Sequence, residues 1–362
     1  MTAIAHYSRD NDYWTDLQSK TIDCLRFPMA VAVVVLHQGS DSIVGATGAL
    51  RCLCVFFSEG ICRLAVPLFF FVSGYLFFNN LNDWSWTAWR VKIRHRVKSL
   101  FIPYFLWNSI AFLVFWGFSF HLGNGMSFCQ YFHKVGGVQL FWNTGSGIPF
   151  GGTVFPLDSP LWFIRDLMVY TLLTPVIYTF IKGMGLTGYV VVLGIFVIVS
   201  GLIPEGFVFF LTGSVLQING KNIVRIIWDK RIFFYTFASV FLIALLITSG
   251  YSQYWSRFFK ILFLFFGIGA SFCVMASLIL KDLIRNHSFL VRSSFFIFAS
   301  HRILIHQSLV SPLVNHILPS SIGWDCLEFF ITPAIVVLFC LGLFALMELV
   351  LPRTTKTLIG ER

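Results

Sequence analysis

Ten apolar runs recur along the chain, and each is long enough, or nearly long enough, to cross a lipid bilayer. In hydrocarbon, every backbone N–H and C=O must be bonded inside the chain, so runs of this length predict helices. We therefore expect an all-α polytopic membrane protein with about ten transmembrane helices. The predicted spans are 24–42, 61–79, 99–119, 160–181, 186–203, 205–218, 231–249, 259–280, 293–312 and 327–351.

The composition agrees with this class. The chain is 57% hydrophobic and 12% charged, whereas soluble domains are about 25% charged. No polar block is long enough for a separate soluble domain, so we expect one integral-membrane domain over 1–362. Residues 1–20 lack the basic start and short apolar core of a signal peptide, so no cleavage is expected. Several of the eight cysteines lie inside apolar runs, so we expect neither a disulfide framework nor a metal site.

The basic residues indicate the orientation. Cytoplasmic loops of membrane proteins collect Lys and Arg. With the N-terminus in the cytoplasm, 19 of the 26 Lys and Arg residues fall in inner segments and 5 in outer segments. Ten spans then place both termini in the cytoplasm, with an N-terminal segment 1–22, a long outer loop 120–159 and a tail 352–362. Topology thus explains the net charge of +10, and no nucleic-acid partner is expected.

An arginine and a histidine share the first predicted span. Arg26 and His37 are eleven residues apart, which returns a helix to nearly the same face about 16 Å further along its axis. An ionisable side chain inside a membrane is costly to keep and marks a functional site by default. The alternative is that His37 only hydrogen-bonds to a neighbouring helix.

A basic stretch leads into the third predicted span. It contains Arg94, Arg96 and Lys98 and is followed at once by Pro103 and Tyr104. Fixed cations at a helix start suit the phosphates of a cytosolic donor molecule. Plain anchoring to anionic lipid is the alternative.

Polar residues also open the fourth predicted span and lie inside the ninth. Arg165 and Asp166 follow Trp162, and they either neutralise each other or form an interfacial anchor with a snorkelling arginine. His301 falls in mid-span, so we expect it to face a polar cavity or to pack between helices.

A small-residue pair lies in the second predicted span. Ser73 and Gly74 are small enough to let two helices approach closely. We weigh packing above chemistry for this pair.

Together these boxes resemble the membrane-bound acyltransferase-3 family. The resemblance covers nearly the whole chain and follows the family's order. Because the chain ends at Arg362 without a hydrolase-like domain, it is similar to the stand-alone branch that acts on bacterial surface glycans. The matching positions are Leu25, Arg26, Val34, Val35, Leu36 and His37; Pro67, Phe69, Phe70, Ser73 and Gly74; Arg96, Lys98, Ile102, Pro103, Tyr104 and Trp107; Leu161, Trp162 and Phe163; and Phe295, Ile297 and His301.

The resemblance implies a membrane O-acyltransferase. Such an enzyme moves an acyl group, often acetyl, from acyl-CoA to a hydroxyl of a surface polysaccharide or glycolipid precursor. Acyl-CoA is then a donor substrate, with no permanently bound cofactor and no metal. The resemblance also implies a multi-pass protein of the bacterial inner membrane.

The candidate residues receive roles on this basis. His37 is the expected general base, and Arg26 supports catalysis and grips the donor phosphates. The expected donor-binding residues are Arg94, Arg96, Lys98 and Tyr104, and the expected acceptor-binding or supporting residues are Ser73, Trp162, Arg165 and His301. Direct transfer is favoured over a covalent intermediate, because no Ser-centred or Cys-centred triad is apparent.

The competing hypothesis is a transporter or flippase for a glycan or small anion. Its substrate path would be lined by His37, Arg165, His301 and Arg302. Against it stand the lack of a recognisable inverted repeat and the scarcity of acidic residues inside the spans.

Overall fold

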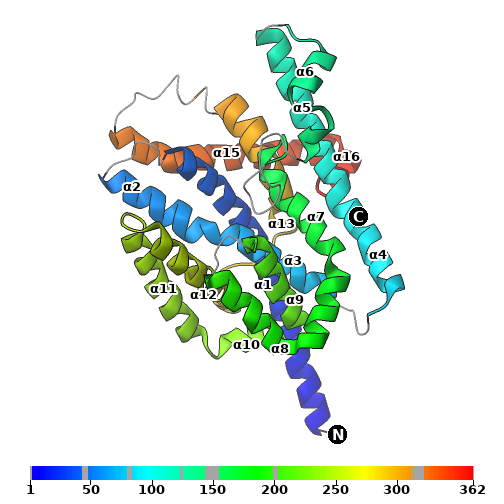
Figure 1. The fold of residues 1–362 in the computed structure, drawn as a ribbon, viewed down its shortest axis with the longest axis vertical. Helices are drawn as coiled ribbons and strands as arrows, with labels where there is room; N and C mark the ends of the chain where they lie inside the picture. Colours follow the sequence, from blue (N-terminus) through cyan, green and yellow to red (C-terminus); the bar gives the residue numbers. More distant parts are fainter. Residues whose placement is uncertain are drawn as a thin grey trace. The chain divides into compact units, whose positions relative to one another are not determined.

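The computed structural model contains helices and no β-strand over the residues that it describes, so the prediction of an all-α polytopic membrane protein is confirmed (Figure 1). The described residues are 2–42, 48–79, 84–122, 125–142, 155–198, 203–310, 313 and 322–361. The elements, with η marking a 3-10 or π segment, are α1 (Thr2–Ser42), α2 (Gly48–Cys54), η1 (Val55–Gly60), η2 (Ile61–Leu64), α3 (Ala65–Phe78), α4 (Trp86–Arg96), η3 (Val97–Phe101), α5 (Ile102–Leu122), α6 (Phe128–Lys134), η4 (Gly137–Phe141), η5 (Ser159–Leu161), α7 (Trp162–Leu172), α8 (Thr174–Ile198), α9 (Glu205–Ile218), α10 (Ile223–Trp228), α11 (Arg231–Thr248), α12 (Gln253–Leu280), α13 (Ser288–Ser300), η6 (His301–Val310), α15 (Ile322–Val350) and α16 (Pro352–Leu358).

Six helical segments within the described residues are long and apolar enough to cross a membrane. Two shorter helices, α9 and α13, are also apolar. The predicted first span lies inside α1, which begins much earlier than residue 24. The count of ten spans and the cytoplasmic termini therefore stay predictions. The six segments are Arg51–Phe78, Trp86–His121, Thr174–Val197, Arg231–Thr248, Gln253–Leu280 and Glu328–Val350.

The predicted fourth span, 160–181, is wrong as one continuous helix. It is divided between α7 and α8 because Pro175 has no N–H to give to the carbonyl of Thr171, four residues earlier. The hydroxyl of Thr174 donates to that carbonyl instead, at 2.6 Å. A second break follows inside α8, where Gly185 has φ +58°, a conformation that suits glycine.

The expected outer loop 120–159 is also more structured than predicted. It contains α6 and η4. Ser127 caps α6 through a reciprocal pair of bonds with Gln130, which satisfies backbone N–H groups at the helix start. The glycine-rich stretch 143–154 lies outside the described residues.

The chain forms two compact units, each made of two separate stretches. The first unit comprises Met1–Asn80 and Val176–Ser294, and the second comprises Leu81–Pro175 and Phe295–Arg362. Each unit therefore brings together segments that are far apart in the sequence.

A polar contact orients α1 within the first unit. The amide of Gln18 donates to the Tyr75 hydroxyl at 3.0 Å, and this hydroxyl donates to the Lys221 carbonyl at 3.0 Å. The side-chain oxygen of Gln18 also accepts from the Ile223 N–H. These bonds join α1 to α3 and to the start of α10, and they hold the helix that carries Arg26 and His37.

Glycines allow α3 and α9 to pack backbone to backbone. A Cβ on Gly74 would lie 2.0 Å from the Phe210 carbonyl oxygen, and a Cβ on Gly213 would lie 2.0 Å from that of Phe71. No side chain fits at such distances. The predicted packing role of the Ser73–Gly74 pair is therefore confirmed for Gly74.

In the second unit, Trp107 links α5 to the C-terminal elements. Its indole N–H donates to the Leu358 carbonyl at 3.0 Å, and its ring meets Phe296 edge to face at 5.3 Å. Phe296 in turn contacts Phe344 of α15. The C-terminal helix α16 is thereby attached to α5.

We expect Gly74→Val to lower the thermal unfolding midpoint of the detergent-solubilised protein. The added atoms meet a backbone carbonyl that cannot rotate away, and overpacking typically costs about 1–3 kcal/mol. The matched control is Gly117→Ala in α5, where a Cβ has nothing within 4 Å. That variant should unfold at the wild-type midpoint or above, and a wild-type midpoint for Gly74→Val would contradict the packing role.

Candidate functional site

Arg26 and His37 lie on one uninterrupted helix, as the sequence predicted. The helix α1 includes both residues and continues through Pro28. Eleven residues of helix place the two side chains on nearly one face, about 16 Å apart along the axis. The His37 side chain is half-buried.

Arg26 has an acidic partner that the sequence analysis did not consider. Its guanidinium lies 3.6 Å from the carboxylate of Asp23, one helical turn earlier. Both side chains are partly exposed, so this pair contributes little to stability. Its consequence is positional, because Asp23 holds the arginine head group near the start of the predicted span.

A pocket of about 310 Å³ in the first unit is lined by Asp23, the partner of Arg26. It is formed by the start of the apolar part of α1 and by the connection from α12 to α13. Two of its lining residues bond to each other, since the Asn286 amide donates to the Asp23 carboxylate at 3.5 Å. The polar lining is Asp23, Arg285, Asn286 and His287, and the apolar lining includes Phe27, Pro28, Met275, Leu283 and Leu290.

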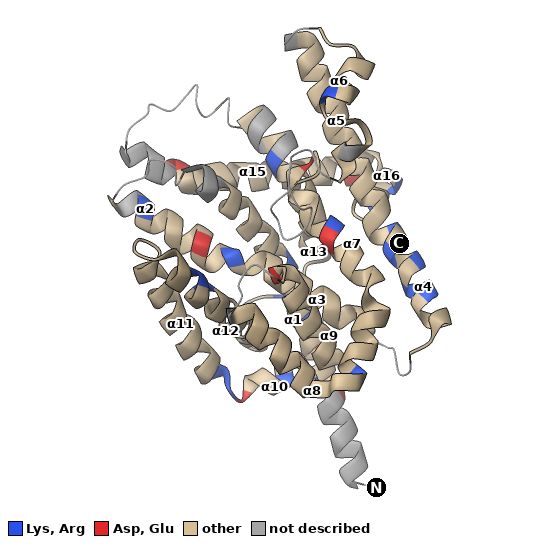
Figure 2. Cartoon of the chain, viewed as in Figure 1, with Lys and Arg blue, Asp and Glu red and all other residues tan. Residues whose placement is uncertain are grey.

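The basic stretch belongs to α4 and η3 of the second unit, where Lys and Arg gather along the helix (Figure 2). Ser85 begins α4 by accepting the Ala88 N–H at 3.1 Å. Arg94 and Lys98 are exposed, and Arg96 is half-buried. The stretch therefore offers at least two accessible cations.

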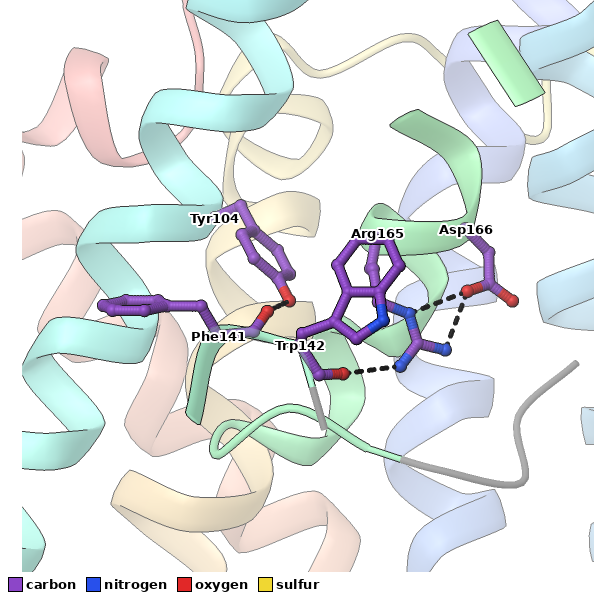
Figure 3. Close-up of polar contacts among 5 residues, drawn as sticks. All are labelled: Tyr104, Phe141, Trp142, Arg165 and Asp166. Atoms are coloured by element: carbon purple, nitrogen blue, oxygen red, sulfur yellow. Dashed lines mark hydrogen bonds and ion pairs between the residues drawn. The ribbon is translucent and has the colours of Figure 1, made fainter. Parts of the chain in front are cut away.

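Tyr104 differs from these cations because it is buried. Its exposed fraction is 4%, and its hydroxyl donates to the Phe141 carbonyl (Figure 3). The Phe141 ring stacks on Phe105 at 4.7 Å. Tyr104 thus joins α5 to η4, and its expected role in donor binding stays a prediction.

Arg165 is fully buried and forms a forked ion pair (Figure 3). Its Nε and Nη2 donate to one Asp166 oxygen at 2.9 and 2.8 Å, and its Nη1 donates to the Trp142 carbonyl at 2.9 Å. The guanidinium also lies over the Trp142 ring, 5.7 Å from its centre. Mutual neutralisation is confirmed, and the snorkelling alternative is wrong because the side chain has no contact with water. Trp162, at the start of α7, is half-buried.

Asp158 is a buried acid that the sequence analysis missed. It is 1% exposed, and neither carboxyl oxygen has a hydrogen-bond partner in the part of the chain that the structure describes. Burial raises the pKa of this carboxyl well above its usual value, since the charged form loses its hydration. An unpaired buried polar group costs about 1–3 kcal/mol.

His301 is buried in the second unit, as predicted for a mid-span residue. Its Nδ1 lies 3.0 Å from the Ile297 carbonyl and 2.8 Å from the Phe298 carbonyl. Carbonyl oxygens only accept, so a neutral ring carries its proton on Nδ1 and its lone pair on Nε2. The local bonds therefore set the tautomer.

The predicted site residues divide between the two units. The first unit holds Arg26, His37 and Ser73, whose side chain is half-buried. The second unit brings together Tyr104 and Arg165 through the adjacent residues Phe141 and Trp142. A joint clamp that combines Arg26 with Arg96 and Lys98 stays a prediction.

Comparison with known protein families gives the class. A family model described as an acyltransferase domain matches residues 19–349, which include every candidate site residue. The chain therefore belongs to the acyltransferase-3 family.

This acyltransferase-3 protein is also similar to one characterised chain by sequence. The succinoglycan biosynthesis protein ExoH of Rhizobium meliloti (strain 1021) is 26% identical over 164 residues. The match covers 44% of this chain and 42% of the relative, so it spans less than half the length of each. No solved structure matches the chain.

Over the ranges that the structure describes, no three His, Cys, Asp or Glu side chains come close enough together to hold a metal ion.

We expect Arg165→Met to lower the free energy of unfolding by about 3–5 kcal/mol, because it leaves the Asp166 charge buried without its partner. The double variant Arg165→Met with Asp166→Leu removes both charges and should regain much of that loss. Chemical denaturation in detergent measures both variants. If the single and double variants lose the same free energy of unfolding, the loss does not come from an unpaired Asp166 charge.

We expect Asp158→Asn to stabilise the protein more at neutral pH than at acidic pH. The raised pKa keeps the folded wild-type carboxyl protonated to a higher pH than the unfolded one, which ionises above about pH 4. The unfolded chain then binds fewer protons, so wild-type stability falls as pH rises from there towards the raised folded pKa. The asparagine variant lacks this loss. Thermal unfolding midpoints of both proteins across the pH range test this prediction. A difference in midpoint that does not change with pH would contradict the raised pKa of Asp158.

Proposed function

We propose that the protein is a membrane O-acyltransferase. It moves an acyl group, acetyl in the simplest case, from acyl-CoA to a hydroxyl of a cell-surface polysaccharide or glycolipid precursor. Membership of the acyltransferase-3 family supports the reaction class. The similarity to a succinoglycan biosynthesis protein supports a glycan acceptor and, with it, a bacterial inner-membrane location.

The observation that carries the proposal is the pairing of Arg26 and His37 on one face of α1. A sugar hydroxyl is a weak nucleophile at neutral pH, and a positioned imidazole typically accelerates its attack by about 10²–10⁴-fold. The half-buried His37 supplies such a base, and Arg26 supplies a positive charge about 16 Å away along the helix axis. Neither feature is needed for a helix that only spans the bilayer.

The reaction proceeds by direct transfer. The acceptor hydroxyl attacks the thioester carbonyl carbon while the neutral His37 imidazole takes the hydroxyl proton. The carbon–sulfur bond then breaks, and the coenzyme A thiolate takes the proton from the imidazolium. The products are an ester and free coenzyme A thiol, and His37 returns to its neutral form.

The donor approaches from the end of the predicted first span that carries Arg26. The pocket that Asp23 lines combines apolar walls with the carboxyl, amide and imidazole groups of Asp23, Asn286 and His287, which suit a nucleobase. Arg26 holds the donor phosphates. The exposed Arg94 and Lys98 and the half-buried Arg96 are the further cations that we propose for donor binding. The distance of about 16 Å from Arg26 to His37 leaves room for the extended thioester arm.

The family match also favours an enzyme over the transporter that the sequence left open. A carrier would need its buried polar side chains to line a path, whereas Arg165 is committed to Asp166 and to the Trp142 carbonyl. His37, which lies in the first predicted span, is a potential general base.

We expect His37→Ala to insert normally but to lose acyl transfer by about 10²-fold or more. The test uses the full-length protein in nanodiscs with radiolabelled acetyl-CoA and with un-acylated surface carbohydrate extracted from a deletion strain of the source organism. Transferred label measures the rate, and saturable binding of acetyl-CoA without acceptor measures the donor site.

The matched control is His133→Ala, which removes an exposed histidine of α6 and should keep the wild-type rate. Near-normal transfer by His37→Ala would exclude this histidine as the base. Failure of the wild-type protein to bind acetyl-CoA would favour the transporter instead.

A further inference from the structure

The carboxyl group of Asp158 has no structural task that explains its burial. It is 1% exposed, and both of its oxygens lack a hydrogen-bond partner among the described residues. Buried polar groups are nearly always bonded, so an exception requires a reason such as a ligand or a catalytic role.

The ordinary reason for an aspartate at this place is excluded by the local sequence. Asp158 is the residue before η5, where a carboxylate usually accepts a backbone N–H of the following turn. Pro160 has no N–H to give, and the Leu161 N–H donates to the Asp158 carbonyl at 3.0 Å. The carboxyl group therefore does not cap the helix.

The backbone around Asp158 is nevertheless held firmly. Its N–H donates to the side-chain oxygen of the buried Asn108 at 3.0 Å, and the neighbouring Leu157 N–H donates to the Leu140 carbonyl at 2.8 Å. Asn108 itself is held by its bond to the Tyr104 carbonyl at 2.9 Å. These two contacts thus fix the backbone of a residue whose side chain makes no hydrogen bond within the described chain.

The charged neighbours of Asp158 are bonded elsewhere. Asn108 links the Asp158 backbone to the Tyr104 carbonyl, and the Tyr104 hydroxyl bonds to Phe141, the residue before the Trp142 that Arg165 contacts. Arg165 donates to Asp166 and to the Trp142 carbonyl, and Tyr104 donates to Phe141. Arg165 thus already balances the charge of Asp166, and the Asp158 carboxyl remains available for a hydrogen bond to a ligand.

We propose that Asp158 binds a hydroxyl group of the acyl acceptor, a neutral carbohydrate, in the second unit. This inference rests on the proposed function and names the acceptor side of it. Burial away from water favours the uncharged form of a carboxyl group that has no cation of its own. An uncharged carboxyl matches a neutral ligand, because a cation would then add net charge to an apolar site. It can accept from a sugar hydroxyl and, when protonated, donate to a sugar oxygen.

Exposed aromatic rings near Asp158 suit the same ligand. Trp142 is 42% exposed and Phe155 is 41% exposed. The two rings belong to the segments that the Leu157–Leu140 bond joins. The apolar faces of exposed aromatic rings pack against the C–H faces of sugars, while the carboxyl supplies the directional bond.

The test measures transfer by the full-length protein in nanodiscs with the acetyl-CoA and extracted carbohydrate described above, varying one substrate at a time. We expect Asp158→Ala to raise the half-saturating concentration of carbohydrate about tenfold or more, as the loss of one hydrogen bond to a buried group predicts. The half-saturating concentration of acetyl-CoA should not change. Asp158→Asn, which can still donate and accept, should lose less.

A matched control and a stability measurement separate binding from folding. Asp16→Asn replaces an exposed aspartate of α1 and should leave both concentrations unchanged. The unfolding midpoint of Asp158→Asn should equal or exceed that of the wild type at neutral pH. An unchanged carbohydrate requirement in Asp158→Ala, or equal losses for both substrates, would overturn the inference and leave the proposed function standing. If the wild type transfers no label, both the proposed function and the inference about Asp158 are contradicted.

Discussion

Polar groups in this chain must find partners within it wherever lipid or packed side chains replace water. That requirement explains why the described residues are helical, since a helix bonds its own backbone. It also explains local repairs, such as the Thr174 hydroxyl that takes the carbonyl that Pro175 leaves unpaired. Where helices approach most closely, as at Gly74 and Gly213, the side chain is absent altogether.

The same requirement separates structural polar residues from those with another task. Gln18 and Tyr75 bond to each other and to the backbone around α10, and Arg165 and Asp166 neutralise each other as an ion pair. Asp158 departs from this pattern, because its backbone is bonded and its carboxyl group is not. Proteins keep such uncompensated groups mainly where binding or chemistry uses them.

The candidate site could be predicted where its information is local. The shared face of Arg26 and His37 follows from helical periodicity once the run is known to be helical. The pairing of Arg165 with Asp166 follows from adjacency. The pairing of Asp23 with Arg26 could also have been predicted, because a carboxylate three residues before an arginine faces it on a helix.

Other features depend on segments far apart in the chain. The backbone of Asp158 bonds to Asn108, fifty residues earlier, and the pocket lined by Asp23 is completed by the connection after α12. No periodicity or motif encodes such contacts.

By itself, the sequence determined that this protein is helical, membrane-embedded and equipped with an ionisable stripe on its first apolar run. Hydrophobicity and helical period are properties of neighbouring residues, so they can be read without a fold. Only the tertiary structure decided which buried polar groups are satisfied and which are not. That distinction depends on contacts between distant segments, and it is the reason that Asp158, rather than Arg165, is left with its hydrogen-bonding capacity unused.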